Sequence, residues 1–112
     1  MLEAALVSAR IDPPPLVAGN VFDRLPDVLD RVPSECVVCV FHTFTLYQFS
    51  PRASERLSLL LAEHAKERKL FRISMEPQGS RSSLEIARFE YGLPSHRKLA
   101  DVDHHGRWIQ WL

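Results

Sequence analysis

The segment that most constrains the fold is CVVCVFH, an almost continuous apolar run at residues 36–42. Its valines are branched at Cβ and favour extended backbone, and the run is too short for a typical helix. Apolar side chains on both sides of a strand are typical of a sheet that helices cover on both faces. We therefore expect residues 36–42 to form a buried strand of an α/β domain.

Both cysteines of the chain, Cys36 and Cys39, lie in this run with C-x-x-C spacing. The spacing raises two chemical alternatives, a redox dithiol and half of a metal site. Redox pairs work at a helix N-terminus, whereas side chains three apart in a strand point to opposite sides of the sheet. No second cysteine pair exists to complete a zinc site. We predict two free thiols that pack as small buried hydrophobic residues, and no metal site.

Outside this run, apolar spacing and proline positions predict alternating helices and strands. Ser50 followed by Pro51 indicates a helix start, because serine caps the first turn and proline is tolerated at the first helical position. The order predicts parallel strands with crossover helices, followed by an antiparallel meander. We expect helices at 2–10, 23–32 and 51–68, and strands at 16–18, 36–42, 70–75, 84–91, 97–102 and 107–111.

Length and charge limit the classes of function. A chain of 112 residues is expected to be a single α/β domain, 1–112. Its 14 basic and 14 acidic residues give zero formal net charge, whereas a nucleic-acid partner requires a basic face. No apolar run approaches the ~20 residues that span a membrane, and the first residues do not form a signal peptide. We expect a cytoplasmic protein with neither a nucleic-acid nor a membrane partner.

His42 ends the apolar run, and Glu76 follows the strand expected at 70–75. Ligands of α/β sheets bind at the carboxyl ends of parallel strands, so neighbouring strands would bring these two side chains to one rim. A histidine–carboxylate pair there can do acid–base work. The alternative is a histidine that hydrogen-bonds a loop carbonyl and organises the turn. His42 and Glu76 are the candidate catalytic residues, with that alternative open.

The string DHHG at residues 103–106 contains possible metal ligands, but between two strands it is first of all a hairpin turn whose glycine supplies positive φ. Trp108 and Trp111 follow it and face opposite sides of a strand. They are expected to be packing residues, or interface residues if they are exposed.

Two strings, PPPLVAGNVFDRLPDVLDRVPSECVVCVFHTFTLYQFSP and DHHGRWIQWL, resemble the C-terminal part of an uncharacterised family of bacterial proteins. That family has a Rossmann-like fold similar to that of S-adenosylmethionine-dependent methyltransferases. The resemblance therefore implies a partial Rossmann, methyltransferase-like mixed sheet. LVAGNVFD resembles the third strand of that fold, CVVCVFHTF the fourth and LFRISMEP the fifth.

The resemblance also implies where a cofactor would bind. Asn20 and Val21 follow the third strand and Thr43 follows the fourth, which makes these three the expected cofactor-binding positions. Asn20 stands where the family usually has an aspartate. The first two strands of the methyltransferase pattern, with their Gly-rich loop, have no counterpart in this sequence. We therefore expect no catalysis and no S-adenosylmethionine binding by the chain alone; both are implied only for a completed domain.

In the methyltransferase sheet the fourth strand is central, so without the first two strands residues 36–42 become an edge. An apolar edge with unpaired N–H and C=O groups promotes association. Either residues 16–18 pair with it, or two chains pair across a two-fold axis. We expect a homodimer through the edge of strand 36–42. The alternative function is accordingly a small self-associating α/β interaction module.

Overall fold

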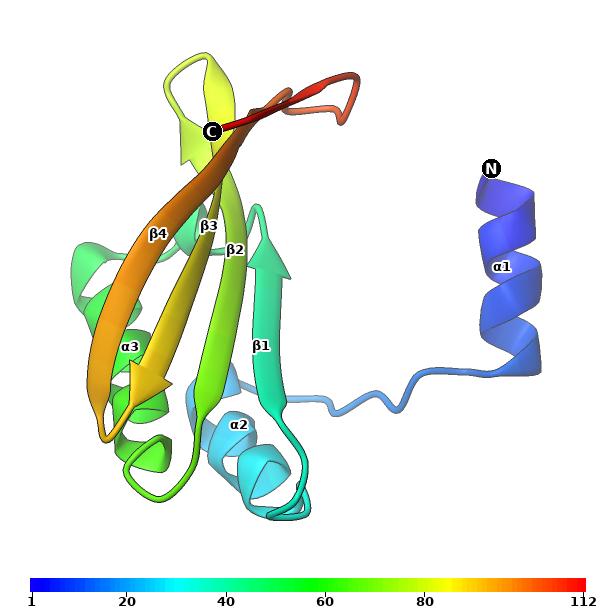
Figure 1. The fold of residues 1–112 in the computed structure, drawn as a ribbon. Helices are drawn as coiled ribbons and strands as arrows, with labels where there is room; N and C mark the ends of the chain where they lie inside the picture. Colours follow the sequence, from blue (N-terminus) through cyan, green and yellow to red (C-terminus); the bar gives the residue numbers. More distant parts are fainter.

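A five-stranded mixed sheet forms the centre of the computed structural model, which describes residues 1–112 (Figure 1). Only the first two strands are parallel, and each later strand is antiparallel to the one before it. The expected mixed α/β sheet with a C-terminal antiparallel meander is therefore confirmed. The strands lie side by side in chain order: β1 (Val38–Thr43), β2 (Leu70–Gln78), β3 (Arg81–Glu90), β4 (Leu93–Val102) and β5 (Ile109–Trp111).

Two helices cover one face of the sheet. The crossover between the parallel strands contains the 3-10 turn η1 (Leu46–Gln48) and α3 (Pro51–His64). As expected, α3 starts at Pro51, and the Ser50 hydroxyl accepts the Ala53 N–H at 3.1 Å. Beside α3 lies α2 (Val21–Asp30), which begins where the Asn20 side chain accepts the Phe22 N–H at 2.9 Å. Figure 1 shows both helices on the same side of the strands.

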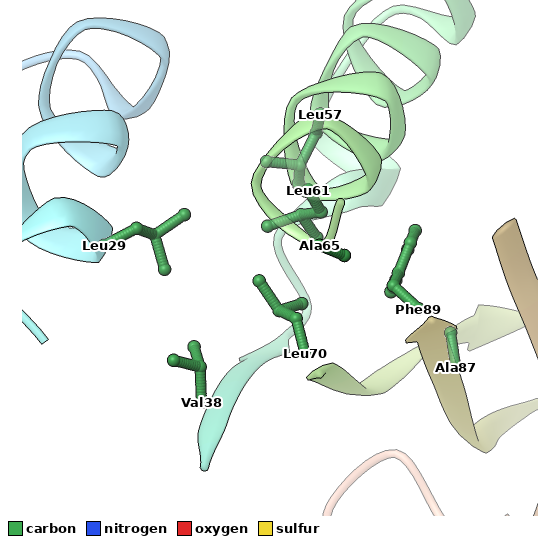
Figure 2. Close-up of a cluster of buried hydrophobic side chains, with 8 residues drawn as sticks. All are labelled: Leu29, Val38, Leu57, Leu61, Ala65, Leu70, Ala87 and Phe89. Carbon is green, nitrogen blue, oxygen red and sulfur yellow. The ribbon is translucent and has the colours of Figure 1, made fainter. Parts of the chain in front are cut away.

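The core lies between these helices and the covered face (Figure 2). Strand register places Val38 beside Leu70, and Leu70 beside Phe89, so the three side chains point the same way. Burial of each large apolar side chain contributes roughly 1.5–3 kcal/mol, which makes this cluster the main source of stability. Its members are Leu29, Val38, Leu57, Leu61, Ala65, Leu70, Ala87 and Phe89.

The opposite face of the sheet has no helix against it (Figure 1). Its side chains alternate with those of the core, and β1 is the edge strand with no neighbour on its outer side. Phe41 of β1 accordingly keeps 76% of its surface exposed. We call the outward apolar side chains of β1 and β2 the open face: Cys39, Phe41, Phe71, Ile73 and Met75.

The N-terminal helix α1 (Leu2–Ile11) stands apart from the rest of the domain (Figure 1). Residues 12–20 connect it to α2 without forming a helix or a strand. None of the residues of α1 is buried. The domain therefore consists of a packed body and a separate helix on an extended connection.

Three expectations about the first half of the chain are wrong. Residues 16–18 form no strand, because the proline-rich segment before them leads away from the sheet and does not reach the edge of β1. Strand 36–42 begins only at Val38 and is buried on one face, because both packed helices lie on the same side. Cys36 and Cys39 are free, as expected, but exposed rather than buried.

The later boundaries differ because the hairpins are tighter than the sequence suggested. β3 starts at Arg81 and β4 at Leu93, before the expected 84 and 97, so two-residue turns join β2 to β3 and β3 to β4. Tyr91 and Gly92 both have positive φ (52° and 76°), as a type I′ hairpin requires. The helix expected to reach 68 ends at His64, and Arg68 instead donates to the carbonyls of residues 32, 33 and 36.

Candidate functional site at the carboxyl ends of the parallel strands

His42 and Glu76 meet where β1 and β2 end. The strands pair in parallel through Thr43 and Met75, so the two side chains reach the same rim. The His42 Nδ1 lies 2.7 Å from Glu76 Oε1, and the two side chains keep only 10% and 19% of their surface exposed. The juxtaposition expected from the sequence is therefore confirmed. The partner of His42 is this carboxylate and not a loop carbonyl.

The Glu76 carboxylate also holds the loop that follows β1. Its Oε1 accepts the N–H groups of Thr45 and Leu46 at 3.0 Å, and its Oε2 accepts the N–H of Tyr47 at 3.3 Å. Burial alone would raise the pKa of Glu76, but the hydrogen bonds from Leu46, Thr45, His42 and Tyr47 outweigh it and lower the pKa. The ionised carboxylate of Glu76 thus organises the turn. The alternative left open from the sequence had assigned this role to His42.

The second ring nitrogen of His42 has no partner. Nε2 is buried and makes no hydrogen bond. Because Nδ1 donates to the ionised Glu76, the neutral ring carries its proton on Nδ1 and leaves a lone pair on Nε2. A carboxylate-oriented imidazole with a free Nε2 is the arrangement of a general base. Here that nitrogen is shut away from solvent, so a substrate has no open approach to it.

A polar pocket of about 320 Å³ lies beside the pair on the covered face of β2 and β3. Arg72 is its main cation and is only 9% exposed; Nη1 donates to Ser58 Oγ at 3.0 Å and Nε has no partner. Burial lowers the pKa of Arg72, and the nearby Glu85 carboxylate opposes that shift. On the neighbouring strand β3, Ser83 donates to Glu85 at 2.7 Å. The only sequence signal for this pocket was an arginine inside the apolar string LFRISMEP.

The expected cofactor-binding residues do not form one cluster with the pair. The side-chain oxygen of Asn20 is occupied as the cap of α2, and Val21 is the half-buried first residue of that helix. Thr43 is exposed at the end of β1, on the same rim as His42, and its carbonyl accepts the Thr45 hydroxyl. Of the three, only Thr43 lies next to the histidine–glutamate pair.

The turn between β4 and β5 brings a second histidine to this rim. His104 Nδ1 lies 2.8 Å from Ser82 Oγ, and its ring meets Phe44 edge-on with centroids 6.0 Å apart. In the same turn, the Arg107 guanidinium and two backbone N–H groups hold the pKa of Asp103 well below its usual range. Sequence DHHG is thus the predicted hairpin turn, closed by its own hydrogen bonds.

Trp108 lies just before β5 and Trp111 lies on it, and they keep 44% and 66% of their surface exposed. Neither belongs to the core cluster. A further pocket, of about 590 Å³, lies at the other end of the sheet between the ends of α2 and α3. It surrounds Arg68, whose guanidinium donates to three carbonyls there and fixes the approach to β1.

These features define a class: a small mixed α/β domain with a polar rim at the carboxyl ends of its one parallel strand pair. The chain belongs to a bacterial family described as "uncharacterized protein conserved in bacteria (DUF2332)", whose model matches residues 1–111. The expected uncharacterised bacterial family is thereby confirmed. No curated protein and no solved structure is significantly similar to the chain. None of its helices combines the length and apolarity needed to cross a membrane.

Proposed function

We propose that this chain is a self-associating α/β interaction module whose contact surface is the edge of β1 together with the open face. The observation that carries the proposal is Phe41, a large apolar side chain 76% exposed on an unpaired edge strand. Such an edge offers unpaired backbone groups and apolar surface at the same place. Two copies related by a two-fold axis would each bury Phe41 against the other.

The sequence of β1 supports this proposal because it carries no protection against association. Natural edge strands are commonly blunted by lysine, proline or a bulge, and VCVFHT contains neither of these residues. The zero formal net charge also removes long-range repulsion between copies. The two exposed free thiols suit a reducing compartment, so a cytoplasmic location is part of the proposal.

Light scattering on gel-filtered protein tests the proposal. The wild-type chain should elute with the mass of a dimer, and Phe41→Lys should elute as a folded monomer because it places a charge in the contact. Tyr91→Lys is the matched control, since Tyr91 is similarly exposed but lies in the β3–β4 turn. A monomeric wild-type chain, or equal effects of the two variants, would count against the β1 contact.

A second candidate function is that of a methyltransferase-like domain in which this chain supplies the later strands. The observation that favours it is the parallel pair β1–β2 with a connecting helix and a polar rim at its carboxyl end, where α/β folds bind ligands. In this proposal His42 and Glu76 act in acid–base chemistry, and Asn20, Val21 and Thr43 face the cofactor.

Calorimetric titration with S-adenosylmethionine separates the two candidates. The chain alone should bind no cofactor at micromolar concentration, because the Asn20 oxygen caps α2 and His42 Nε2 is closed off. If the chain binds S-adenosylmethionine at micromolar concentration and Thr43→Ala weakens this binding, the methyltransferase-like candidate is favoured. The expectation that the chain alone binds no cofactor would then be wrong.

A further inference from the structure

The helix α1 has the surface of a buried element although nothing covers it. In LEAALVSARI only Glu3, Ser8 and Arg10 are polar, so apolar side chains surround most of the helix. Leu2 and Leu6, which lie one turn apart on the same side, are both largely exposed. A helix that is apolar nearly all round belongs in an interior or an interface.

Helix length leads to the same conclusion. An isolated helix shorter than ~12–15 residues is marginal in water, and α1 has 10. It makes no buried contact with its own body and has no side-chain cap at its N-terminus. The stability of α1 must therefore come from a surface outside its own packed body.

The connection to α2 directs α1 outward. Residues 13–15 are three consecutive prolines, which fix φ and keep the chain extended. Figure 1 shows that the connection leaves the body on the side of β1 and carries α1 beyond the free edge of that strand. The space beyond this edge is where the proposed self-association places the second copy.

We propose that α1 of one copy packs across β1 of a second copy, with the Leu2 and Leu6 side of the helix covering Cys39, Phe41 and the neighbouring open face. This inference rests on the proposed self-association and names the segment that performs it. A helix laid over an edge strand is one of the ways in which proteins protect such edges. The exchange is reciprocal, so a two-fold dimer uses two identical contacts and closes on itself.

Cysteine cross-linking between two differently tagged copies tests the exchange. The first copy carries Leu6→Cys together with Cys36→Ser and Cys39→Ser, so its only thiol lies on α1. The second copy carries Cys36→Ser alone, so its only thiol is the exposed Cys39. A short bis-maleimide is added to the mixture, and covalent heterodimer is measured on a gel. In the matched control the first copy carries Ser8→Cys, about half a turn away on α1, in place of Leu6→Cys.

The exchange predicts heterodimer formation roughly tenfold faster from Leu6→Cys than from Ser8→Cys, because docking raises the local concentration of one thiol beside the other. Equal rates, or no heterodimer, would overturn the α1 contact. The uncross-linked mixture is also analysed by sedimentation. A dimer that forms no Leu6–Cys39 cross-link but is dissociated by Phe41→Lys means that the copies meet at β1 without α1, so the proposed function stands and this inference falls. A monomer means that the proposed function itself fails.

Discussion

Glu76→Gln removes one charge from the rim while keeping the size of the side chain. In the wild type the carboxylate accepts four hydrogen bonds, from the His42 ring and from the N–H groups of Thr45, Leu46 and Tyr47. The amide keeps one acceptor oxygen and turns an NH₂ group toward one of these donors. The loop after β1 should therefore lose both charge assistance and one acceptor.

The magnitude follows from the number of bonds. A hydrogen bond to a charged group contributes about 1.5–3 kcal/mol and a neutral one about 0.5–1.5, so each of the bonds loses roughly 1 kcal/mol. Because the Glu76 side chain keeps 19% of its surface exposed, water compensates in part. We expect Glu76→Gln to lower the free energy of unfolding by about 3 kcal/mol.

Urea denaturation at a series of pH values is the assay. The folded-state pKa of Glu76 lies below its ordinary value of 4.5, so its stabilisation is fully present above that pH. It is lost as the pH falls through the folded pKa. The difference between wild type and Glu76→Gln should thus stay constant near neutral pH and shrink in acid.

Glu90→Gln is the matched control. Glu90 also lies on a strand, but its partners Lys69 and Arg88 are solvent-exposed, and such pairs contribute about 0–1 kcal/mol. If Glu76→Gln lowers the free energy of unfolding no more than Glu90→Gln does, or if its effect does not shrink in acid, the view that Glu76 holds the loop is refuted.

Two further predictions concern the core and the open face. Leu61→Ala, at a fully buried position of α3, should destabilise the chain by about 3 kcal/mol in thermal or urea unfolding, whereas exposed Leu59→Ala should change the stability by less than about 0.5 kcal/mol. Both thiols should react with a maleimide in dilute native protein, and Cys39 should become slower than Cys36 as the concentration rises; slow reaction of both thiols at every concentration would show that they are buried.

The contact between His42 and Glu76 could be predicted from the sequence because it depends on local rules. An apolar run, a capped helix and a second strand specify two parallel neighbours, and parallel neighbours bring their carboxyl ends to one rim. The mixed sheet and the hairpin at residues 103–106 follow equally from turn residues and strand spacing. These features need no knowledge of which face a helix covers.

The burial of the cysteines could not be predicted in the same way. CVVCVFH has the composition of a strand covered on both faces, but both packed helices lie on one side of the sheet, which leaves Cys39 and Phe41 exposed. Residues 16–18 had strand composition but do not pair with the free edge of β1. The three loop N–H groups that donate to Glu76 could not be predicted either, because every residue except proline has a backbone N–H and no residue type marks these donors.

Sedimentation equilibrium of the wild-type chain over a wide concentration range tests the central claim, which is that β1 and the open face are a contact surface between copies. A contact at β1 predicts a reversible monomer–dimer equilibrium that Phe41→Lys shifts to monomer, while the variant keeps a cooperative urea-unfolding transition. A wild-type chain that stays strictly monomeric from micromolar to hundreds of micromolar concentration would contradict it.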